Sequence, residues 1–396
     1  MQTRRFGRTE LQMPVYSCGG MRYMYKWRDV PLGEVPPENQ ANLEATIRRS
    51  VELGINHIET ARGYGSSERQ LGLVLPTFPR DELIVQTKIA PTSDPAEFVA
   101  HFRESLQRLQ LDYVDLLGLH GINTHELLWW SVRKNGCLAA ARELQAEGLV
   151  RHIGFSTHGS TEVILDTIQQ EAYGGFDYVN LHWYYINQKN WPGVEAAAAA
   201  DMGVFIISPS DKGGMLYKPT EKLVELCQPY HPLVFNVLFC LQRPEVHTLS
   251  LGASCPDDFE MQVAALKELD SAGQHLETIE DRLYAAMVDA VGEDVAQHWS
   301  EGLPEWEAAP GYMNIPVILW LRNLLLAYDM QDYGKMRYNL LGNGEHWFPG
   351  QNSAHVEKLD LERSLKNSPF AEQIPGWLRE THEQLYEAPK KRLSQS

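Results

Sequence analysis

The sequence lacks several features that mark whole classes of protein. Its longest apolar stretch, residues 315–326, is interrupted by Arg322 and Asn323, so it falls short of the ~18 residues that a membrane span needs. No apolar segment follows Met1 to Arg8, and we therefore expect no signal peptide. Lys and Arg number 35 against 52 Asp and Glu, so nucleic acid and anionic membranes are not expected as partners. We expect a soluble cytoplasmic protein.

Cysteine is scarce and scattered. The five cysteines are odd in number and include no C-x-x-C pair, which argues against a disulfide scaffold and against zinc or iron-sulfur sites. The 14 histidines include no H-x-x-x-H pair, so no metal is expected. Nothing marks Cys18 or Cys255 as a nucleophile, although both lie near expected strand ends. The sequence also lacks two glycine-rich phosphate-binding motifs. They are G-x-G-x-x-G after a strand and G-x-x-x-x-G-K-[ST].

Short apolar runs alternate with segments of helical periodicity from residue 15 to about residue 272. This alternation predicts repeated βα units with a parallel sheet. The eight expected strands are 15–19, 55–60, 83–88, 114–120, 152–156, 178–182, 204–208 and 248–252. Among the expected helices are 39–53, 67–75, 95–109, 136–147 and 161–171. Eight units favour a closed (β/α)8 TIM barrel over an open sheet, so we expect an α/β barrel domain over 1–274 and a mainly helical domain over 275–396.

Four side chains with useful chemistry lie at or just after expected strand ends. Glu59 and Tyr64 follow the second strand, Lys88 ends the third and His120 ends the fourth. The carboxyl ends of barrel strands meet at one mouth, where these groups suit the reduction of a carbonyl by hydride transfer. Tyr64 would protonate the alkoxide, with its phenolate stabilised by Lys88. His120 would donate a hydrogen bond to the carbonyl oxygen, and Glu59 would hold Lys88.

These residues and the motifs around them resemble the aldo-keto reductase family. The resemblance rests on Gly54–Ala61, Tyr64–Glu68, Lys88, His120 and Gly148–Ser156, and it covers roughly residues 1–272. It implies a (β/α)8 barrel that binds NADPH without a Rossmann fold and reduces an aldehyde or ketone to an alcohol. The alternative is a weakly active or inactive nucleotide-binding barrel with a regulatory or scaffold role.

The family's cofactor positions carry over only in part. The resemblance assigns Ser156 and Asn180 to the nicotinamide carboxamide, with Asn180 in place of the usual glutamine. Ile207 replaces the aromatic residue that stacks on the nicotinamide, and the loop with Lys212 and Gly213 lies where the diphosphate is held. The full set of expected cofactor positions is Ser156, Thr157, Asn180, Ile207, Ser208, Lys212, Gly213, Gly252, Ser254, Asp258 and Gln262.

Two departures from the family pattern bear on cofactor choice and rate. Asp258 stands where the family has an arginine for the 2′-phosphate of NADPH, counted back from Gln262. A carboxylate repels that phosphate, so NADH is an alternative to NADPH. Glu59 stands where the family has Asp, and catalytic geometry is sensitive to shifts of about 1 Å.

The substrate is expected to be a small carbonyl compound bound by loops at the barrel mouth. Arg62, Trp27 and Trp183 are the main expected contacts, with Arg22, Arg28 and Tyr184 as further ones. Arginines there would suit an anionic or oxygen-rich compound. His158, which follows Ser156 by two residues, is expected to hydrogen-bond within its loop.

The segment from Ile315 to Pro375 resembles the C-terminal ferredoxin-like extension of one aldo-keto reductase subgroup. The four cysteine positions of that extension hold Lys358, Leu361, Ser364 and Ser368 here. We expect no iron-sulfur cluster, because the thiolate ligands are missing. A protein partner for this domain is a further expectation.

Overall fold

The computed structural model describes residues 1–388 and divides into two compact units. Among the described residues, one unit comprises Met1–Gly213 and Asn236–Asp270, and the other comprises Gly214–Phe235 and residues 271–388. The segment Gly214–Phe235 was expected within the barrel domain, whereas here it groups with the C-terminal helices. The division into domains 1–274 and 275–396 stays a prediction.

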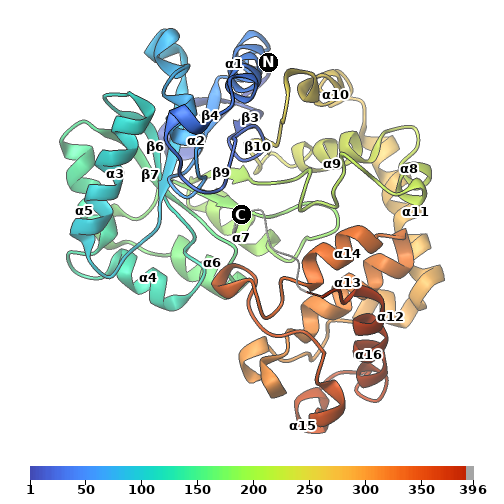
Figure 1. Cartoon of the computed structure of the whole chain (residues 1–396). Coiled ribbons are helices and arrows are strands. Elements are labelled where there is room, and N and C mark those ends of the chain that lie inside the picture. Colours follow the sequence, from blue (N-terminus) through green and yellow to red (C-terminus); the bar gives the residue numbers. More distant parts are fainter. Residues whose placement is uncertain (389–396) are drawn as a thin grey trace. The chain divides into compact units, whose positions relative to one another are not determined.

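Eight parallel strands form a closed barrel in the first unit, in the order β10-β3-β4-β5-β6-β7-β8-β9 (Figure 1). The strands are β3 (Tyr16–Gly19), β4 (His57–Glu59), β5 (Ile84–Ile89), β6 (Val114–Leu119), β7 (Val150–Ser156), β8 (Tyr178–Leu181), β9 (Gly203–Ile206) and β10 (Thr248–Leu251). Each expected strand is present, with ends that differ by at most two residues. The predicted (β/α)8 barrel is confirmed.

The N-terminal residues form an antiparallel pair that the sequence analysis missed. Strands β1 (Thr3–Arg5) and β2 (Gln12–Pro14) pair with each other. Between them, the fully buried Phe6 packs 5.8 Å from the Tyr178 ring, and a side chain at Gly203 would collide with it. Gly203 opens β9 and Tyr178 opens β8, so Phe6 fills the amino-terminal end of the barrel.

Three of the helices begin after short polar side chains that accept hydrogen bonds from backbone N–H groups of the first turn. Asp94, Thr124 and Ser160 accept hydrogen bonds from backbone N–H groups in the first turns of α3, α4 and α6. The helices up to residue 265 are α1 (Pro37–Glu52), α2 (Ser67–Leu71), α3 (Pro95–Leu109), α4 (His125–Val132), α5 (Cys137–Ala146), α6 (Thr161–Ile168), α7 (Trp191–Ala199), α8 (Glu221–Leu226), α9 (Pro232–Leu241) and α10 (Glu260–Ala265).

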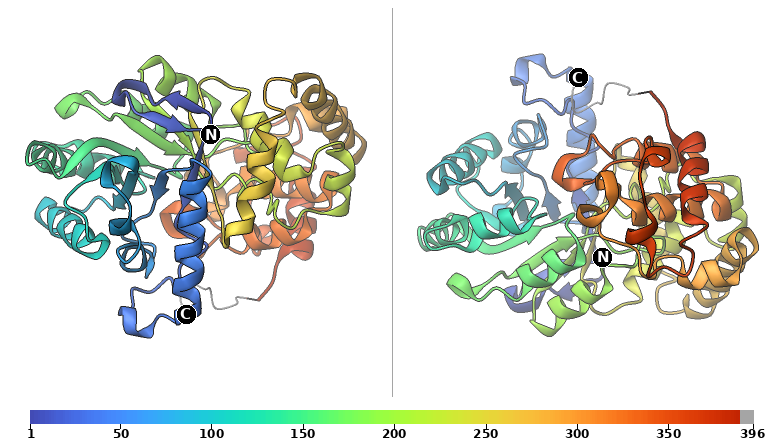
Figure 2. Two further views of the ribbon diagram at one scale, coloured as in Figure 1. Left: turned by 90° about the horizontal axis from the view of Figure 1, so that it is seen from above. Right: turned by 90° about the horizontal axis from the view of Figure 1, so that it is seen from below.

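The second unit is built mainly from helices after residue 271, coloured orange to red in Figure 2. They are α11 (Gly273–Val291), α12 (Glu293–His298), α13 (Ile315–Tyr328), α14 (Gln331–Tyr338), α15 (Glu362–Leu365) and α16 (Ile374–Leu385). Helix α13 packs against α11, α14 and α16. The Arg322 guanidinium lies over the Trp377 ring, 4.6 Å from its centroid. The Tyr338 hydroxyl and His382 Nδ1 share a hydrogen bond of 2.6 Å. Within residues 1–388, no helix is long and apolar enough to span a membrane.

A buried aspartate on β6 ties three segments of the barrel together. Asp115 is 1% exposed, pairs with Arg80 at 2.6 Å and Arg151 at 3.0 Å, and accepts the Val85 N–H at 2.9 Å. We expect Asp115→Ala to lower the free energy of unfolding by about 2 to 3 kcal/mol, because it leaves these donors without their acceptor. Urea unfolding checks this. The exposed neighbour Asp112 provides the control, since Asp112→Ala should change the free energy of unfolding by less than about 0.5 kcal/mol.

Candidate active site

The four strand-end residues expected to act together lie together. The ammonium of Lys88 forms an ion pair with Glu59. The Tyr64 hydroxyl donates to Glu59 Oε1 at 3.4 Å and accepts from Lys88 Nζ at 3.4 Å. The ring of His120 lies 5.7 Å from that of Tyr64, nearly perpendicular to it. A phenol, an ammonium, a carboxylate and an imidazole therefore meet at the carboxyl ends of β4, β5 and β6.

Strand register and a small residue allow this convergence. Glu59 pairs with Gln86 on β5, and Lys88 pairs with Gly118 on β6. A Cβ at Gly118 would lie 3.2 Å from Lys88 Cγ, so glycine leaves room for the lysine side chain. The Lys88 ammonium also donates to the Thr60 carbonyl at 3.0 Å. Lys88 is thus held by three acceptors, Glu59, the Thr60 carbonyl and the Tyr64 hydroxyl.

Burial sets the protonation of the two central groups. Lys88 is 1% exposed, and burial lowers its pKa well below the ordinary value. The adjacent carboxylate of Glu59 favours the charged ammonium. Burial also raises the pKa of Tyr64. The phenol consequently stays protonated at neutral pH, which is the state that a proton donor needs.

A tight turn aims Tyr64 at this cluster. Gly65 has a φ of +51°, and a Cβ there would collide with the backbone of Lys26 and Trp27, so glycine is required. Trp27 packs edge-on against Tyr64, with ring centroids 6.1 Å apart. The segment that contains Trp27 therefore covers the phenol, in keeping with its expected place at the substrate mouth.

At the positions expected to bind the nicotinamide, buried polar atoms lack hydrogen-bond partners. Ser156 pairs in register with Asn180, and its hydroxyl accepts the Gly121 N–H at 3.0 Å. Asn180 is fully buried, yet neither its Nδ2 nor its Oδ1 has a hydrogen-bond partner. Such a group normally finds a partner. A carboxamide, with one donor group and one acceptor, supplies what Asn180 lacks, so these residues fit a nicotinamide cofactor.

The expected diphosphate and adenine positions lie after β9 and β10. Ser208 has a φ of +55° and accepts the Lys212 N–H at 3.0 Å, while a Cβ at Gly213 would collide with the Pro209 carbonyl. Beyond β10, Gly252 accepts a hydrogen bond from Arg22 at 2.6 Å. The buried Oε1 atom of Gln262 has no partner, so this end of the expected site also offers an acceptor.

Asp258 is held as a carboxylate. Its Oδ2 accepts the Ser254 N–H at 2.7 Å and the Ser254 hydroxyl at 2.6 Å. Partial burial acts to raise its pKa, but these hydrogen bonds outweigh burial and hold the pKa below its ordinary value. A negative charge therefore occupies the position at which the resemblance puts the 2′-phosphate arginine.

Comparison with known proteins identifies the family of the chain. The model of the Aldo/keto reductase family matches residues 17–225, more than half of the chain. The chain belongs to the aldo/keto reductase family.

Individual relatives of this aldo/keto reductase are distant. L-galactose dehydrogenase from Arabidopsis thaliana is 27% identical over 76% of this chain and 98% of the relative. NADH-specific methylglyoxal reductase from Escherichia coli is 24% identical, over 56% of this chain and 81% of the relative. The holo structure of an aldo-keto reductase from Bacillus halodurans has a TM-score of 0.60 at 20% identity, covering 71% of this chain and 96% of the other. That likeness supports the fold.

Two of the expected substrate contacts have other partners in this aldo/keto reductase. The Arg62 guanidinium pairs with Glu104 on α3 at 2.6 Å. Trp183 is 2% exposed and packs against Trp191 and Phe239, with ring centroids 4.8 and 5.0 Å away. An ion pair engages Arg62 and ring stacking engages Trp183, and their contact with a substrate stays a prediction.

One strand-end residue was missed. His182 directly follows β8, and its Nε2 lies 2.5 Å from Nδ1 of His158. The signal was available in the sequence: His182 stands two residues after Asn180, just as His158 stands two residues after Ser156.

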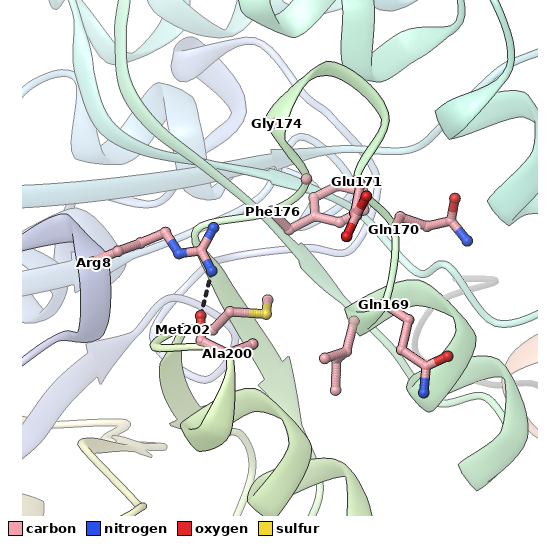
Figure 3. A pocket seen from close by; sticks show the side chains of 10 residues that line it. Arg8, Gln169, Gln170, Glu171, Gly174, Phe176, Ala200 and Met202 are labelled. Carbon is pink, nitrogen blue, oxygen red and sulfur yellow. Dashed lines mark hydrogen bonds between the residues drawn. The ribbon is translucent and has the colours of Figure 1, made fainter.

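A cavity of about 530 Å³ lies away from Glu59, Tyr64, Lys88 and His120. Figure 3 shows the residues that line this cavity. Its walls include Arg8, Glu171 and Phe176, and Met202 closes one side. Phe176 and Met202 precede β8 and β9, so the cavity opens at the amino-terminal end of these strands. The four converging residues lie at the carboxyl ends, and the cavity is therefore not the catalytic pocket.

Proposed function

We propose that this protein reduces an aldehyde or ketone to an alcohol by hydride transfer from NADH or NADPH, with Tyr64 as the general acid. The observation that carries the proposal is the Tyr64 hydroxyl, which lies 3.4 Å from both Lys88 Nζ and Glu59 Oε1. A phenol between a cation and a hydrogen-bond acceptor is equipped to release and recover a proton. When bound, the nicotinamide cofactor supplies the hydride.

Each residue of the cluster has one task in this proposal. Tyr64 donates its proton to the developing alkoxide. The ammonium of Lys88 stabilises the phenolate that remains, and Glu59 keeps that ammonium charged and in place. His120, whose ring lies beside Tyr64, donates a hydrogen bond to the carbonyl oxygen. The buried setting strengthens these electrostatic effects because the local dielectric constant is low.

The function is tested by hydride transfer itself. The purified chain is mixed with NADH or NADPH deuterated at C4 and a panel of aldehydes and ketones, and deuterium in the alcohol is measured by mass spectrometry. Transfer to one face of one or more carbonyl compounds is the expected result. Binding of a dinucleotide without transfer to any of them, and without oxidation of the matching alcohols, would instead favour the nucleotide-binding scaffold.

The panel starts from small oxygen-rich carbonyl compounds. Two relatives are named for such compounds, L-galactose dehydrogenase and methylglyoxal reductase. Arg22 is exposed near the mouth and offers a cation that an oxygen-rich or anionic substrate would use. Trp27 offers an apolar ring beside Tyr64.

Asp258 directs the choice between the two cofactors. Its carboxylate repels the 2′-phosphate of NADPH and accepts a hydrogen bond from the ribose 2′-hydroxyl of NADH. We propose that NADH binds at least as tightly as NADPH, which reverses the preference implied by the family resemblance.

Removing this charge should favour NADPH. Asp258→Asn keeps an oxygen for Ser254 but deletes the negative charge. We expect the ratio of the NADPH Kd to the NADH Kd to fall about tenfold, equivalent to about 1.4 kcal/mol. Fluorescence titration with each cofactor measures the two Kd values. Asp257→Asn removes an exposed neighbouring charge and should leave the ratio nearly unchanged, and an equal change in both variants would contradict a specific role for Asp258.

The C-terminal unit is proposed to be a cluster-free domain that binds a protein partner. Its resemblance to a ferredoxin-like extension stays a prediction, because the family match ends at residue 225. The sequence has no cysteine after Cys255, so residues 275–396 offer no thiolate for an iron-sulfur cluster. Between residues 271 and 388 the unit is helical, with isolated bridges such as that between Met313 and Gln351.

A further inference from the structure

A chain of alternating charges brackets the turn that carries the proposed general acid. The Arg62 guanidinium pairs with Glu104 at 2.6 Å, and Glu104 pairs in turn with Arg108 at 2.7 Å. Arg108 continues to Asp29 at 2.7 Å, and the Asp29 carboxylate accepts from Arg69 Nε at 2.7 Å and Nη2 at 3.1 Å. We refer to these five residues as the ionic chain. It begins two residues before the proposed acid and ends five residues after it.

Asp29 is the member of the ionic chain that a different loop contributes. It lies between β3 and α1, where residues 20–31 form neither helix nor strand. In the same segment, Trp27 packs edge-on against Tyr64, with ring centroids 6.1 Å apart. The Tyr25 N–H donates to Gln70 Oε1 at 2.9 Å. Trp27 is therefore tied down on both sides, by a hydrogen bond before it and by a charge after it.

The ionic chain is connected to a buried part of the barrel. Glu68 on α2 is 1% exposed and accepts from the Thr87 hydroxyl at 2.6 Å and the Ser105 hydroxyl at 3.0 Å. Arg108 Nη1 lies 3.7 Å from Glu68 Oε2, and the Arg108 side chain is only 8% exposed. Thr87 directly precedes Lys88 on β5. Arg108 thus connects the ionic chain to the strand that carries Lys88.

The pairs of Asp29 define position more than they add stability. The side chains of Asp29 and Arg69 are about one third exposed, and ion pairs at such sites contribute little to the free energy of unfolding because water screens them. A guanidinium that donates two bonds to one carboxylate nevertheless fixes their relative orientation. Asp29 is held in this way by α2 and also by Arg108 on α3. Its loss should loosen the loop without unfolding the barrel.

We propose that Asp29 is a positioning residue for the carbonyl substrate. Through Arg69 and Arg108 it fixes the Trp27 ring beside Tyr64, and this ring forms one wall of the space in which a carbonyl group meets the phenol. The carbon skeleton of the aldehyde or ketone packs on the indole. The inference rests on the proposed function and deepens it, because it makes substrate affinity depend on a charge that takes no part in proton transfer.

Asp29→Asn removes the charge and keeps the size of the side chain. With saturating cofactor, KM should rise about 3- to 10-fold, the range that one aromatic contact contributes. The kcat should change by less than about twofold, because Tyr64 and Lys88 keep their contacts and only binding is lost. Steady-state rates measure both, with the aldehyde that the deuterium assay shows to be reduced fastest, starting from methylglyoxal and benzaldehyde.

Three further variants control this result. Asp29→Glu restores the charge and should recover part of the lost affinity. Arg69→Gln breaks the same ion pair from α2, so it should raise KM in the same direction and decides the case if Asp29→Asn does not fold. Asp201 pairs with Arg5 at 2.6 Å, just before β9 and thus at the other end of the barrel. Asp201→Asn should leave KM unchanged.

A double variant tests whether the charge acts through the ring. Trp27→Ala alone should raise KM, because the wall is removed. Adding Asp29→Asn to Trp27→Ala should then cause no further increase, since two residues that act through one contact are not additive. A role of Asp29 in folding alone would increase KM equally in both backgrounds.

A second measurement follows Trp27 without turnover. The full chain is labelled with fluorotryptophan, and the fluorine NMR signal of Trp27 is identified by its loss in Trp27→Phe. Asp29→Asn should shift or broaden this signal, whereas Asp201→Asn should not. If no carbonyl compound is reduced, the proposed function fails, and this signal alone decides whether Asp29 holds Trp27. An unchanged signal in Asp29→Asn, a changed signal with unchanged KM, or equal KM increases with and without Trp27 overturns the inference.

Discussion

Tyr64→Phe should lower turnover about 10² to 10⁴-fold, the usual contribution of a positioned general acid. The substitution removes the one atom that contacts both Lys88 and Glu59 and keeps the ring that packs on Trp27 and His120. Cofactor affinity should stay the same, because the proposed nicotinamide positions at Ser156 and Asn180 are untouched. Turnover in steady state and cofactor Kd by fluorescence give the two readouts.

A second tyrosine in the barrel provides the matched control. The hydroxyl of Tyr113 accepts from Arg151 at 2.8 Å, at the segment that precedes β6 and thus at the other end of the strand from His120. Tyr113→Phe should leave turnover within about twofold of the parent, since surface hydrogen bonds of this kind contribute little. If Tyr64→Phe retained full turnover, the proton would come from another group and the proposed function would need a different acid.

The barrel could be predicted because its strands are buried on both faces. Strands such as β6 and β9 are buried throughout, so they appear in the sequence as short, mostly apolar runs between segments of helical periodicity. The pair β1 and β2 was missed because each is only three residues long and Thr3–Arg5 is largely exposed and polar. Runs of that length and composition carry no periodic signal.

Convergence of the four catalytic candidates was predictable for a related reason. Parallel strands in a barrel bring their carboxyl ends to one mouth, so position along each strand was enough. Side-chain direction was not predictable. Arg62 lies two residues before Tyr64 but reaches Glu104, and Trp183 follows the strand end but lies in the core. These outcomes depend on partners in helices α3, α7 and α9, which a position along a strand does not indicate.

Glu59 contacts both Lys88 and Tyr64, an arrangement that the sequence could not specify. Its carboxylate pairs with Lys88 and also receives the hydrogen bond of Tyr64. A negative charge this close to the phenol disfavours the phenolate, in the same direction as burial, which raises the pKa of Tyr64. Lys88 is the group that opposes both effects.

Lys88→Met should therefore affect turnover and stability together. Turnover should fall about 100-fold or more, because no cation remains to stabilise the phenolate. The free energy of unfolding should fall by about 3 to 5 kcal/mol, because Glu59, 3% exposed, is left as a buried carboxylate without its ion-pair partner. Activity assays and urea unfolding measure the two effects separately.

The double variant Lys88→Met with Glu59→Gln separates catalysis from folding. It removes both buried charges, so most of the lost stability should return, whereas turnover should stay low because the cation is still missing. The parent enzyme supplies a matching pH test. Burial lowers the pKa of Lys88, so the ammonium is lost at a lower pH than that of an exposed lysine, and turnover should decline as the pH rises. Recovery of turnover in the double variant would show that Lys88 serves the fold alone and that the phenolate of Tyr64 is stabilised by another group.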